Sequence, residues 1–496
     1  MPDKSVVRPS RRRKRDRGEA PAQSIEQERP GAVRHVFRRV IHHSSPATGQ
    51  IPILDWLTGS PYENPQLIGE PAETEELVSI SFVLDLGEAL FRYGAGALEV
   101  ETSIIAVTAA FGMKNTDVDI TNQSIILNWA PEGKIPYSRV RVVRSWSVNF
   151  RALSEVHQLV TDIISGRLRR AEAETRLLEI TRQPKPYPRW VATLAGAVFA
   201  GLFASYTGAP PLDAALGFVA TLLVLAVTKV LSTWRMPEIF ALAAGGLLAT
   251  VVALSALYAG ADITPSMVVA GGLMILLPSV RIVSAIQDTI NAFPITAAGR
   301  LVSSLVAFAG MTAGIMVAVV LGHQAGAPQV EVAEGITRIY PAAVLMILVF
   351  LTAISAAVVQ QAPYRLLLPT GAVAALGFTG FYAGELLGLG DWFTPLIGAV
   401  IIGALARVTA LWLGAPQLVV AVPAMMFMLP GLLIFRGMYQ IAISESAAYR
   451  TAGLYQLFDA LIIIMAIAAG IVLGDVTMRP ATKRFQSNER SRGRRR

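Results

Sequence analysis

A chain of 496 residues could hold about three soluble domains of roughly 150 residues each, but its composition excludes that arrangement for most of its length. Hydrophobic residues make up 53% and charged residues only 16%, against about 25% charged residues in a soluble domain. The apolar residues gather in runs too long for a globular core, so we predict a mostly α-helical, polytopic membrane protein. Because cysteine is absent, disulfides, thiolate metal sites and cysteine nucleophiles are excluded.

Residues 1–76 show no sustained apolar periodicity and carry a basic run from Arg11 to Arg15. Such a composition buries too little apolar surface to offset the conformational entropy of ordering, so we expect a disordered tail. The basic run either tethers the chain to anionic lipid of the inner leaflet or is a solvated tail that helps to set the topology. Residues 479–496 form a second basic tail at the C-terminus.

Residues 77–185 lack long apolar runs and are predicted to form a cytoplasmic α+β domain. Helical spacing of apolar residues is broken by glycines, and alternation, a polar turn and a β-branched run then predict a hairpin. We predict a helical region over residues 77–107 that is interrupted by a break at 94–96. A hairpin over residues 117–127 and a third strand over 140–143 follow, and residues 150–180 are helical again.

Two carboxylates of the predicted hairpin, Asp117 and Asp119, alternate with apolar residues and therefore share one strand face. Two carboxylates on one face suit acid–base chemistry or cation binding. The alternative interpretation is a solvated strand face or a pair that caps a turn.

From residue 186 onward the chain alternates long apolar runs with short polar connections. About 20 apolar residues in a helix cross the roughly 30 Å of a bilayer's hydrocarbon core. We therefore expect about ten spans, in two halves that cover residues 186–325 and 336–478. The ten are 190–207, 212–231, 238–259, 266–283, 296–321, 341–359, 366–386, 393–413, 416–435 and 450–475.

Charges beside the spans predict an orientation. Basic residues flank the first span and then alternate connections, whereas the intervening connections carry acidic residues. By the positive-inside rule, the N-terminal domain and both termini lie in the cytoplasm. Arg436 and Arg450 are exceptions, because they fall on the outer side in this arrangement.

The two halves share a register. Leu277-Pro278 and Leu429-Pro430 are 152 positions apart, and so are Gly322 and Gly474. A repeat of five spans, an odd number, enters the membrane from opposite sides, so we predict two inverted five-helix repeats. Many secondary transporters are built in this way and bind substrate where the halves meet. The alternative is a static scaffold or channel of duplicated ancestry.

Each half interrupts an apolar span with a Leu-Pro pair and places polar residues after it. Proline leaves a backbone carbonyl free, which lipid tolerates only where protein or a water-filled cavity satisfies it. Broken helices also aim half-helix dipoles at charged substrate groups. The predicted breaks are at Pro278, Pro430 and Gly431. The candidates for substrate binding or coupling near them are Ser284, Gln287, Asp288, Asn291, Thr296, Arg436, Tyr439 and Gln440.

Asp288 is the sharpest of these candidates, because an ionisable group in or near the membrane is costly and usually functional. Desolvation would raise its pKa toward values at which it exchanges a proton during transport. The alternative is a solvated loop residue or a helix cap. Asp459, inside the last predicted span, is either a proton-relay partner or a counter-ion for Arg407.

The chain resembles the threonine/serine exporter family of bacterial inner-membrane proteins from about residue 77 to residue 474. The resemblance rests on three groups of residues. The first is Asp117 to Thr121, in the N-terminal domain. The second is Gln287-Asp288 through Pro294 together with Thr296 and Arg300, and the third is Met428 to Leu432 together with Arg436 to Tyr439. It implies efflux of small hydroxylated or neutral amino acids driven by the proton-motive force, with a cytoplasmic N-terminal domain and about ten helices.

These lines together predict a secondary transporter of the bacterial inner membrane that exports threonine and serine, with protons and a bilayer as its other partners. We expect no enzymatic activity, no metal, no cofactor and no nucleic-acid partner, and leave open whether copies form a homo-oligomer. The alternatives are a membrane-anchored enzyme or sensor that acts through the N-terminal domain, or an exporter of another small solute.

Overall fold

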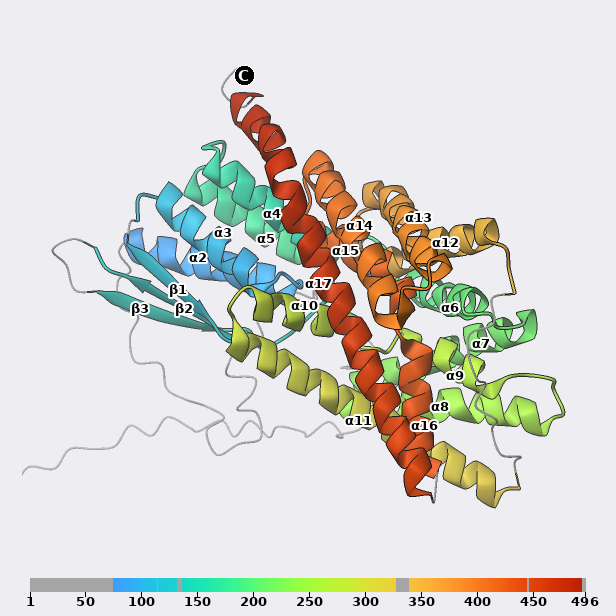
Figure 1. The fold of residues 1–496 in the computed structure, drawn as a ribbon. Helices are drawn as coiled ribbons and strands as arrows, with labels where there is room; N and C mark the ends of the chain where they lie inside the picture. The colour runs from blue at the N-terminus through green and yellow to red at the C-terminus, as the bar shows by residue number, and fades with distance from the viewer. Residues whose placement is uncertain (1–74, 114, 132–135, 327–338, 444–445, 493–496) are drawn as a thin grey trace, which may run out of the picture. The chain divides into compact units, whose positions relative to one another are not determined.

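The computed structural model describes residues 75–492 except 114, 132–135, 327–338 and 444–445 (Figure 1). The predicted tail over residues 1–76 therefore lies almost wholly outside the described residues. Residues 75–182, called here the N-terminal segment, form two helices, a three-stranded sheet and two more helices. In chain order these are α2 (Glu75–Arg92), α3 (Ala97–Ala110), β1 (Thr116–Ile120), β2 (Ser124–Trp129), β3 (Tyr137–Val142), α4 (Phe150–Ile164) and α5 (Arg170–Arg182).

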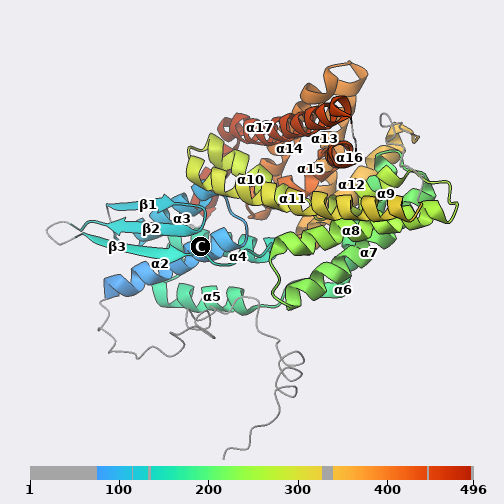
Figure 2. The ribbon, with the colours of Figure 1, turned by 90° about the horizontal axis from the view of Figure 1, so that it is seen from below.

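The local sequence explains these elements. Helix α2 ends at Arg92 because the chain turns at Gly94, whose φ of 108° suits a residue without a side chain. The strands pair antiparallel in the order β1-β2-β3, and Asp117 lies opposite Asn128 in the register. Helix α2 packs on β2 and β3 while α3 packs on β1, so the sheet's apolar face is covered by helices (Figure 2).

The remaining helices are long and apolar. Within the described residues, eight helices are long and apolar enough to cross a membrane, and a ninth candidate is a pair bent by 55°. The chain is thus a multi-pass membrane protein by length and composition. The helices are α6 (Arg189–Tyr206), α7 (Pro211–Thr233), α8 (Glu238–Tyr258), α9 (Pro265–Met274), α10 (Ser279–Ile290), α11 (Pro294–Gln324), α12 (Ala342–Val359), α13 (Tyr364–Leu386), α14 (Gly390–Leu413), α15 (Gln417–Met425), α16 (Gly431–Ile443) and α17 (Ala447–Arg492).

The fourth predicted span, 266–283, differs from the structure. Helix α9 ends at Met274 after 10 residues, and α10 begins only at Ser279. Ten residues in a helix rise about 15 Å, half of the hydrocarbon core. The physical reason is Pro278, which stands immediately before α10 and cannot donate a backbone hydrogen bond to a continuous helix. In the second half, α15, a short 3₁₀ turn over Met426–Met428 and α16 form the bent pair.

Helix α17 is longer than predicted. It begins at Ala447 and continues to Arg492, so residues 479–492 extend the last helix where the sequence predicted a tail. Pro480 lies inside this extension.

The packing partners of the first five membrane elements recur in the second five. Helix α8 packs on α11 as α14 packs on α17, and α9 packs on α7 and α8 as α15 packs on α13 and α14. The two halves meet where α6 packs on α12 and α9 packs on α16.

Glycines allow the closest of these contacts. A Cβ added at Gly314 of α11 would overlap the carbonyl oxygen of Ala243 in α8. One added at Gly474 of α17 would overlap the carbonyl oxygen of Val400 in α14. In both pairs the backbones therefore touch directly, which is the small-residue packing that membrane helices use.

Candidate functional site

The α10–α11 connection, taken here to include the last turn of α10 and the first two turns of α11, holds a buried ion pair against the N-terminal segment. Asp288 Oδ2 lies 2.6 Å from Arg300 Nη1, and both side chains are almost completely buried. The other carboxylate oxygen, Oδ1, accepts a hydrogen bond of 2.9 Å from the backbone N–H of Ala97. Ala97 is the first residue of α3, and no side chain of the helix's own N-cap residue, Gly96, can satisfy that end. Asp288 therefore caps a helix that lies almost 200 positions earlier in the chain.

Arg300 is enclosed by the same segment. Its guanidinium carbon lies 5.0 Å from the ring centroid of Phe91 and 5.2 Å from that of Trp146, both within cation–π range. Its Nη2 donates a hydrogen bond of 3.3 Å to the carbonyl oxygen of Ala95. The guanidinium is thus held by one carboxylate, one carbonyl and two aromatic rings.

A third side chain of this connection ties it to the sheet. Thr296 Oγ1 donates a hydrogen bond of 2.7 Å to the carbonyl oxygen of Ile120, the last residue of β1. Figures 1 and 2 both place the start of α11 beside the strands. Asp288, Thr296 and Arg300 together fix the α10–α11 connection to the N-terminal segment.

Asp288 lies in α10, outside the candidate membrane spans. Burial raises the pKa of its carboxyl group, while the Arg300 charge and the Ala97 N–H oppose that rise. The proton affinity of Asp288 therefore depends on the contacts that fix it: hydration would lower its pKa, and separation from Arg300 would raise it.

The N-terminal segment also contacts the second half. The first N–H groups of α4, those of Phe150 and Arg151, donate to the carbonyl oxygens of Gln360 and Gln361, at 3.1 and 2.9 Å. These carbonyls follow the last turn of α12. The free N–H groups at the start of α4 therefore bind carbonyl oxygens at the end of α12. Farther along α4, Gln158 Nε2 donates to the Gly414 carbonyl oxygen at 3.0 Å, in the α14–α15 connection.

A cavity of about 910 Å³ lies where the N-terminal segment and the two halves meet. The N-terminal segment contributes Arg92, Tyr93 and Trp146 to its wall. The first half contributes residues of α8, of the α9–α10 break and of α11, and the second half contributes Gln360 and Met426. From the predicted set, Pro278 and Ser284 line this cavity, and so does Arg300, the partner of Asp288.

The predicted binding residues of the first half thus lie between the start of α10 and the first turn of α11, and they differ in burial. Ser284, Asp288 and Thr296 are buried, whereas Gln287 and Asn291 are only partly buried. Asp288 is not a solvated loop residue; it is a helix cap, but for α3 rather than for its own helix.

The predicted residues of the second half lie elsewhere. Arg436, Tyr439 and Gln440 belong to α16 and are absent from the described wall of the 910 Å³ cavity. Tyr439 is buried, with its ring centroid 5.9 Å from that of Phe435. Nε and Nη2 of Arg436 and Oε1 of Gln440 are buried without a hydrogen-bond partner among the described residues.

The two helix breaks face each other across a narrow apolar cleft. A Cβ added at Gly431 would lie 2.6 Å from Met274 Sδ and 3.6 Å from Leu277 Cδ1. Leu277 and Pro430 also line a cleft of about 10 Å³ whose wall is apolar throughout. Leu277 belongs to the wall of the large cavity as well, so this apolar contact lies between the cavity and α16.

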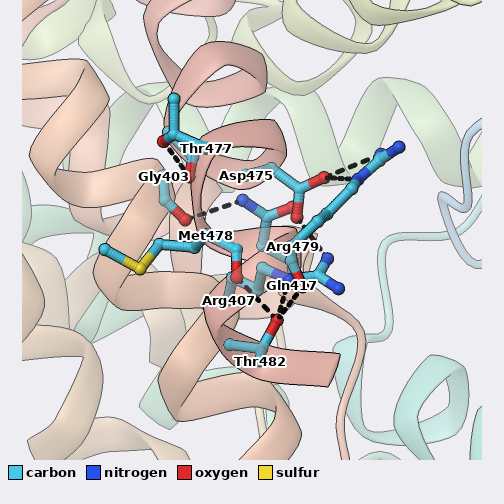
Figure 3. Close-up of polar contacts among 9 residues, drawn as sticks. Gly403, Arg407, Gln417, Asp475, Thr477, Met478, Arg479 and Thr482 are labelled. Carbon is cyan, nitrogen blue, oxygen red and sulfur yellow. Dashed lines mark hydrogen bonds and ion pairs between the residues drawn. The ribbon is translucent and has the colours of Figure 1, made fainter. Parts of the chain in front are cut away.

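The predicted pairing of Asp459 with Arg407 is wrong. Arg407 Nη1 lies 2.7 Å from Asp475 Oδ1, and its Nε donates to Thr482 Oγ1 at 2.9 Å (Figure 3). Arg479 binds the second oxygen of Asp475, at 2.9 Å. The cause is that Asp475 lies beyond the apolar centre of α17, near its basic end, whereas the sequence pattern favoured the carboxylate nearest the middle of the span. Asp459 is partly buried.

Asp117 and Asp119 occupy an exposed strand face, as their alternation predicted. Neither Asp117 nor Asp119 belongs to the described wall of the large cavity.

Tyr93 and Gln360 are among the cavity residues that the sequence pattern did not indicate. Tyr93 stands at the end of α2 just before the Gly94 turn, and Gln360 begins a polar pair that ends the apolar run of α12. A polar residue at the end of a helix is common, so neither position carries a signal without the fold.

Comparisons with known proteins agree with the resemblance noted from the sequence. The family model described as "Putative threonine/serine exporter" matches residues 81–322, and the one described as "Threonine/Serine exporter, ThrE" matches residues 345–477. The interval between the two matches, residues 323–344, contains the boundary between the two halves of the membrane region.

Two curated proteins are similar over most of the chain. The "Probable threonine/serine exporter" of Mycobacterium tuberculosis is 30% identical over 409 residues, which cover 81% of this chain and 76% of that protein. The "Threonine/serine exporter" of Corynebacterium glutamicum is 29% identical over 447 residues, which cover 86% and 88%. No solved structure matches. By these matches, and by the helices that carry them, the chain belongs to the threonine/serine exporter family.

Proposed function

We propose that this protein exports threonine and serine from the cytoplasm, as the names of its relatives indicate, and that the 910 Å³ cavity is where the substrate binds. The observation that carries the proposal is the position of this cavity, at the meeting point of the N-terminal segment, the first-half helix break and the second half. Ligand sites of membrane transporters lie at such junctions between repeats, and the volume falls in the usual range of about 300–1,000 Å³ for ligand pockets.

The connections that reach the N-terminal segment support two inverted repeats. In the first half these are the α7–α8 connection, whose Pro237 lines the shared cavity, and the α10–α11 connection. In the second half they are the α12–α13 and α14–α15 connections, through Gln361 and Gly414. By position in the repeat, the α12–α13 and α14–α15 connections correspond to the α6–α7 and α8–α9 connections of the first half. Those two first-half connections lie at the helix ends opposite to the ones that reach the N-terminal segment. A repeat that has turned over in the membrane produces this alternation.

Basic residues near several of these helix ends support a cytoplasmic position for the N-terminal segment. Arg235 and Arg281 lie near the α7–α8 and α9–α10 connections, and Arg365 lies at the start of α13. By the positive-inside rule these ends face the cytoplasm of a bacterial inner membrane. The C-terminal end of α17 lies on this side too, because Asp475 pairs with Arg407, close to the α14 end that leads to Gly414.

Proton coupling is proposed for Asp288. In the docked arrangement burial raises the pKa of its carboxyl group. An opening between α10 and the N-terminal segment would change both the desolvation and the distance to the Arg300 charge that set this pKa, so the protonation of Asp288 would change with the movement. Because Arg300 lines the cavity and pairs with Asp288, substrate entry and this protonation change would act on the same contacts.

Arg436 is proposed as a second substrate contact, on the far side of the apolar cleft. Its buried Nε and Nη2 have no hydrogen-bond partner among the described residues and could bind a carboxylate. In this scheme the amino acid passes from the large cavity between the two helix breaks, once the contact of Leu277 with the second break opens.

The decisive experiment is transport of labelled threonine in proteoliposomes with an imposed pH gradient. We expect the wild-type protein to move threonine and serine in response to the gradient and Asp288→Asn to move them without a pH dependence. Equal transport and equal pH dependence in both proteins would remove Asp288 from the mechanism. No transport by the intact protein under any gradient would contradict the proposed function and favour a sensor or enzyme anchored by the helices.

A further inference from the structure

Two residues that line the large cavity each carry a buried polar atom with no hydrogen-bond partner in the described part of the chain. Tyr93 Oη and Gln360 Oε1 have no hydrogen-bond partner among the described residues, although Tyr93 is 1% exposed and Gln360 is 6% exposed. Both residues line the cavity. Buried polar atoms are nearly always hydrogen-bonded, since an unpaired one costs its full desolvation free energy. A substrate group that enters the cavity and reaches these side chains would supply the missing partners.

The surrounding contacts hold these groups in place. The Tyr93 N–H donates to the carbonyl oxygen of Ala89, and the chain then turns at Gly94. The Gln360 carbonyl oxygen accepts from the Phe150 N–H, and its side-chain Nε2 donates to Met426 Sδ at 3.2 Å. With Nε2 engaged, Oε1 is the half of the amide that stays available.

The chemistry of the two groups is complementary to a hydroxyl. Gln360 Oε1 only accepts a hydrogen bond, while the Tyr93 phenol both donates and accepts. Burial raises the pKa of Tyr93 to about 12, so the phenol keeps its proton throughout the physiological range. A substrate O–H can donate to the amide oxygen and accept from the phenol at the same time, which a methyl group cannot do.

We propose that Tyr93 and Gln360 bind the side-chain hydroxyl of a β-hydroxy amino acid and so select threonine and serine over valine and alanine. The inference deepens the proposed function and rests on it. Sites that hydrogen-bond a substrate hydroxyl reject the analogue that lacks it by up to about 10⁴–10⁵-fold, because their buried polar groups are then left unpaired.

The proposal gives the N-terminal segment a direct part in substrate binding. Tyr93 belongs to this segment and Gln360 to the second half, so a bound hydroxyl would bridge them. Release of the segment would then break the substrate's contact with Tyr93.

The test compares threonine with valine, which replaces the hydroxyl by a methyl group. Transport of each labelled amino acid is measured in proteoliposomes for the wild type, Tyr93→Phe and Gln360→Met. We expect the wild type to prefer threonine and each variant to lose at least tenfold of that preference, through slower threonine transport. The matched control is Tyr187→Phe, since Tyr187 Oη is also buried without a described partner but lies outside the cavity wall.

A second measurement separates binding from folding. Because the deleted groups have no hydrogen-bond partner within the described residues, the melting temperatures of Tyr93→Phe and Gln360→Met without substrate should equal or exceed that of the wild type. Added threonine should raise the melting temperature of the wild type and of Tyr187→Phe more than those of the two cavity variants.

The outcomes for the two proposals differ. Threonine transport by the wild type with an unchanged threonine-to-valine preference in both cavity variants would overturn the role of Tyr93 and Gln360 while leaving the exporter intact. Failure of the wild type to transport or bind threonine would overturn the proposed function itself. A loss of preference in Tyr187→Phe equal to that in Tyr93→Phe would also count against the assignment.

Discussion

Asp288 holds Arg300 with one carboxylate oxygen, at 2.6 Å, and the first backbone N–H of α3 with the other, at 2.9 Å. One side chain of the membrane region thereby neutralises a buried cation and caps a helix of the N-terminal segment. The arrangement explains why two parts of the chain so distant in sequence stay together.

Replacing one member of the Asp288–Arg300 pair should lower the free energy of unfolding more than replacing both members. Asp288→Asn leaves the Arg300 charge buried and unpaired, so we expect a loss of about 3–5 kcal/mol in the free energy of unfolding. Arg300→Gln should cost a similar amount. The double variant should recover a substantial part of the loss, because no buried charge remains.

The measurement is a double-mutant cycle on the detergent-purified protein, followed by transport. If Asp288 only stabilises the fold, the double variant will regain pH-dependent export along with its stability. If it couples transport to protons, the double variant will be stable and still insensitive to the pH gradient. Additive losses in the cycle would mean that the two groups do not interact.

Thr296 should matter for the same docking contact. Thr296→Val removes the hydroxyl that donates to the Ile120 carbonyl oxygen at 2.7 Å and leaves that buried acceptor unpaired, at a cost of about 1–3 kcal/mol. Hydrogen exchange should accelerate at the end of β1. Thr289→Val is the matched control, since Thr289 Oγ1 bonds only to Ala285 within α10 and should leave exchange in β1 unchanged.

Much of this fold was predictable, because the length of an apolar run and the glycine, proline and polar residues that end it are local properties of the sequence. The Gly94 turn, the hairpin between Asp117 and Leu127, and most of the long helices follow from residues that lie side by side in the sequence. The fourth span, 266–283, was bounded by apolar composition, which continues past Met274 and through the break that the sequence itself predicted at Pro278. The backbone follows the proline and not the composition, because proline cannot donate the hydrogen bond of a continuous helix.

The site was predictable only in part. The cost of an ionisable group near the membrane singled out Asp288, but not the helix that it caps, because Ala97 is its partner only after folding. Pairing of Asp475 with Arg407 is equally a property of two packed helices, α14 and α17. Tyr93 and Gln360 stand out only because the structure leaves their polar atoms unpaired in a cavity wall.

Close backbone contact between α8 and α11 predicts a sharp dependence on side-chain size. Gly314→Ala places a methyl group against the Ala243 carbonyl oxygen, which cannot move without shifting the helix, so we expect a loss of about 1–3 kcal/mol or more. Gly217→Ala in α7 is the control, because its new Cβ would lie 3.8 Å from the nearest atom. The measurement is the melting temperature of each purified variant. Equal melting temperatures for Gly314→Ala and Gly217→Ala would mean that α8 and α11 are not in backbone contact.

Arg436 should act on the substrate and not on the N-terminal segment. Its Nε and Nη2 are buried without a described hydrogen-bond partner, so Arg436→Gln removes an unpaired charge and should not lower the melting temperature. Threonine transport should nevertheless fall at least tenfold, since the proposed carboxylate contact is lost. Arg436→Lys keeps the charge without the guanidinium fork and should retain part of the transport. Full transport by Arg436→Gln would exclude this residue from the substrate path.

Alkaline titration tests the burial of Tyr93 directly. Burial raises the pKa of its phenol from 10.0 to about 12, chiefly through desolvation. The folded state therefore holds this proton more tightly than the unfolded state, so the contribution is intact below pH 10 and is lost as the pH rises through about 12. The loss in the free energy of unfolding should reach about 2–3 kcal/mol.

In Tyr93→Phe the free energy of unfolding should fall less steeply between these pH values, and the absorbance of tyrosinate should lack one late-titrating group. A Tyr93→Phe variant whose alkaline unfolding matches that of the wild type would show that the phenol is already hydrated, and an already hydrated phenol would not need a substrate hydroxyl as its partner.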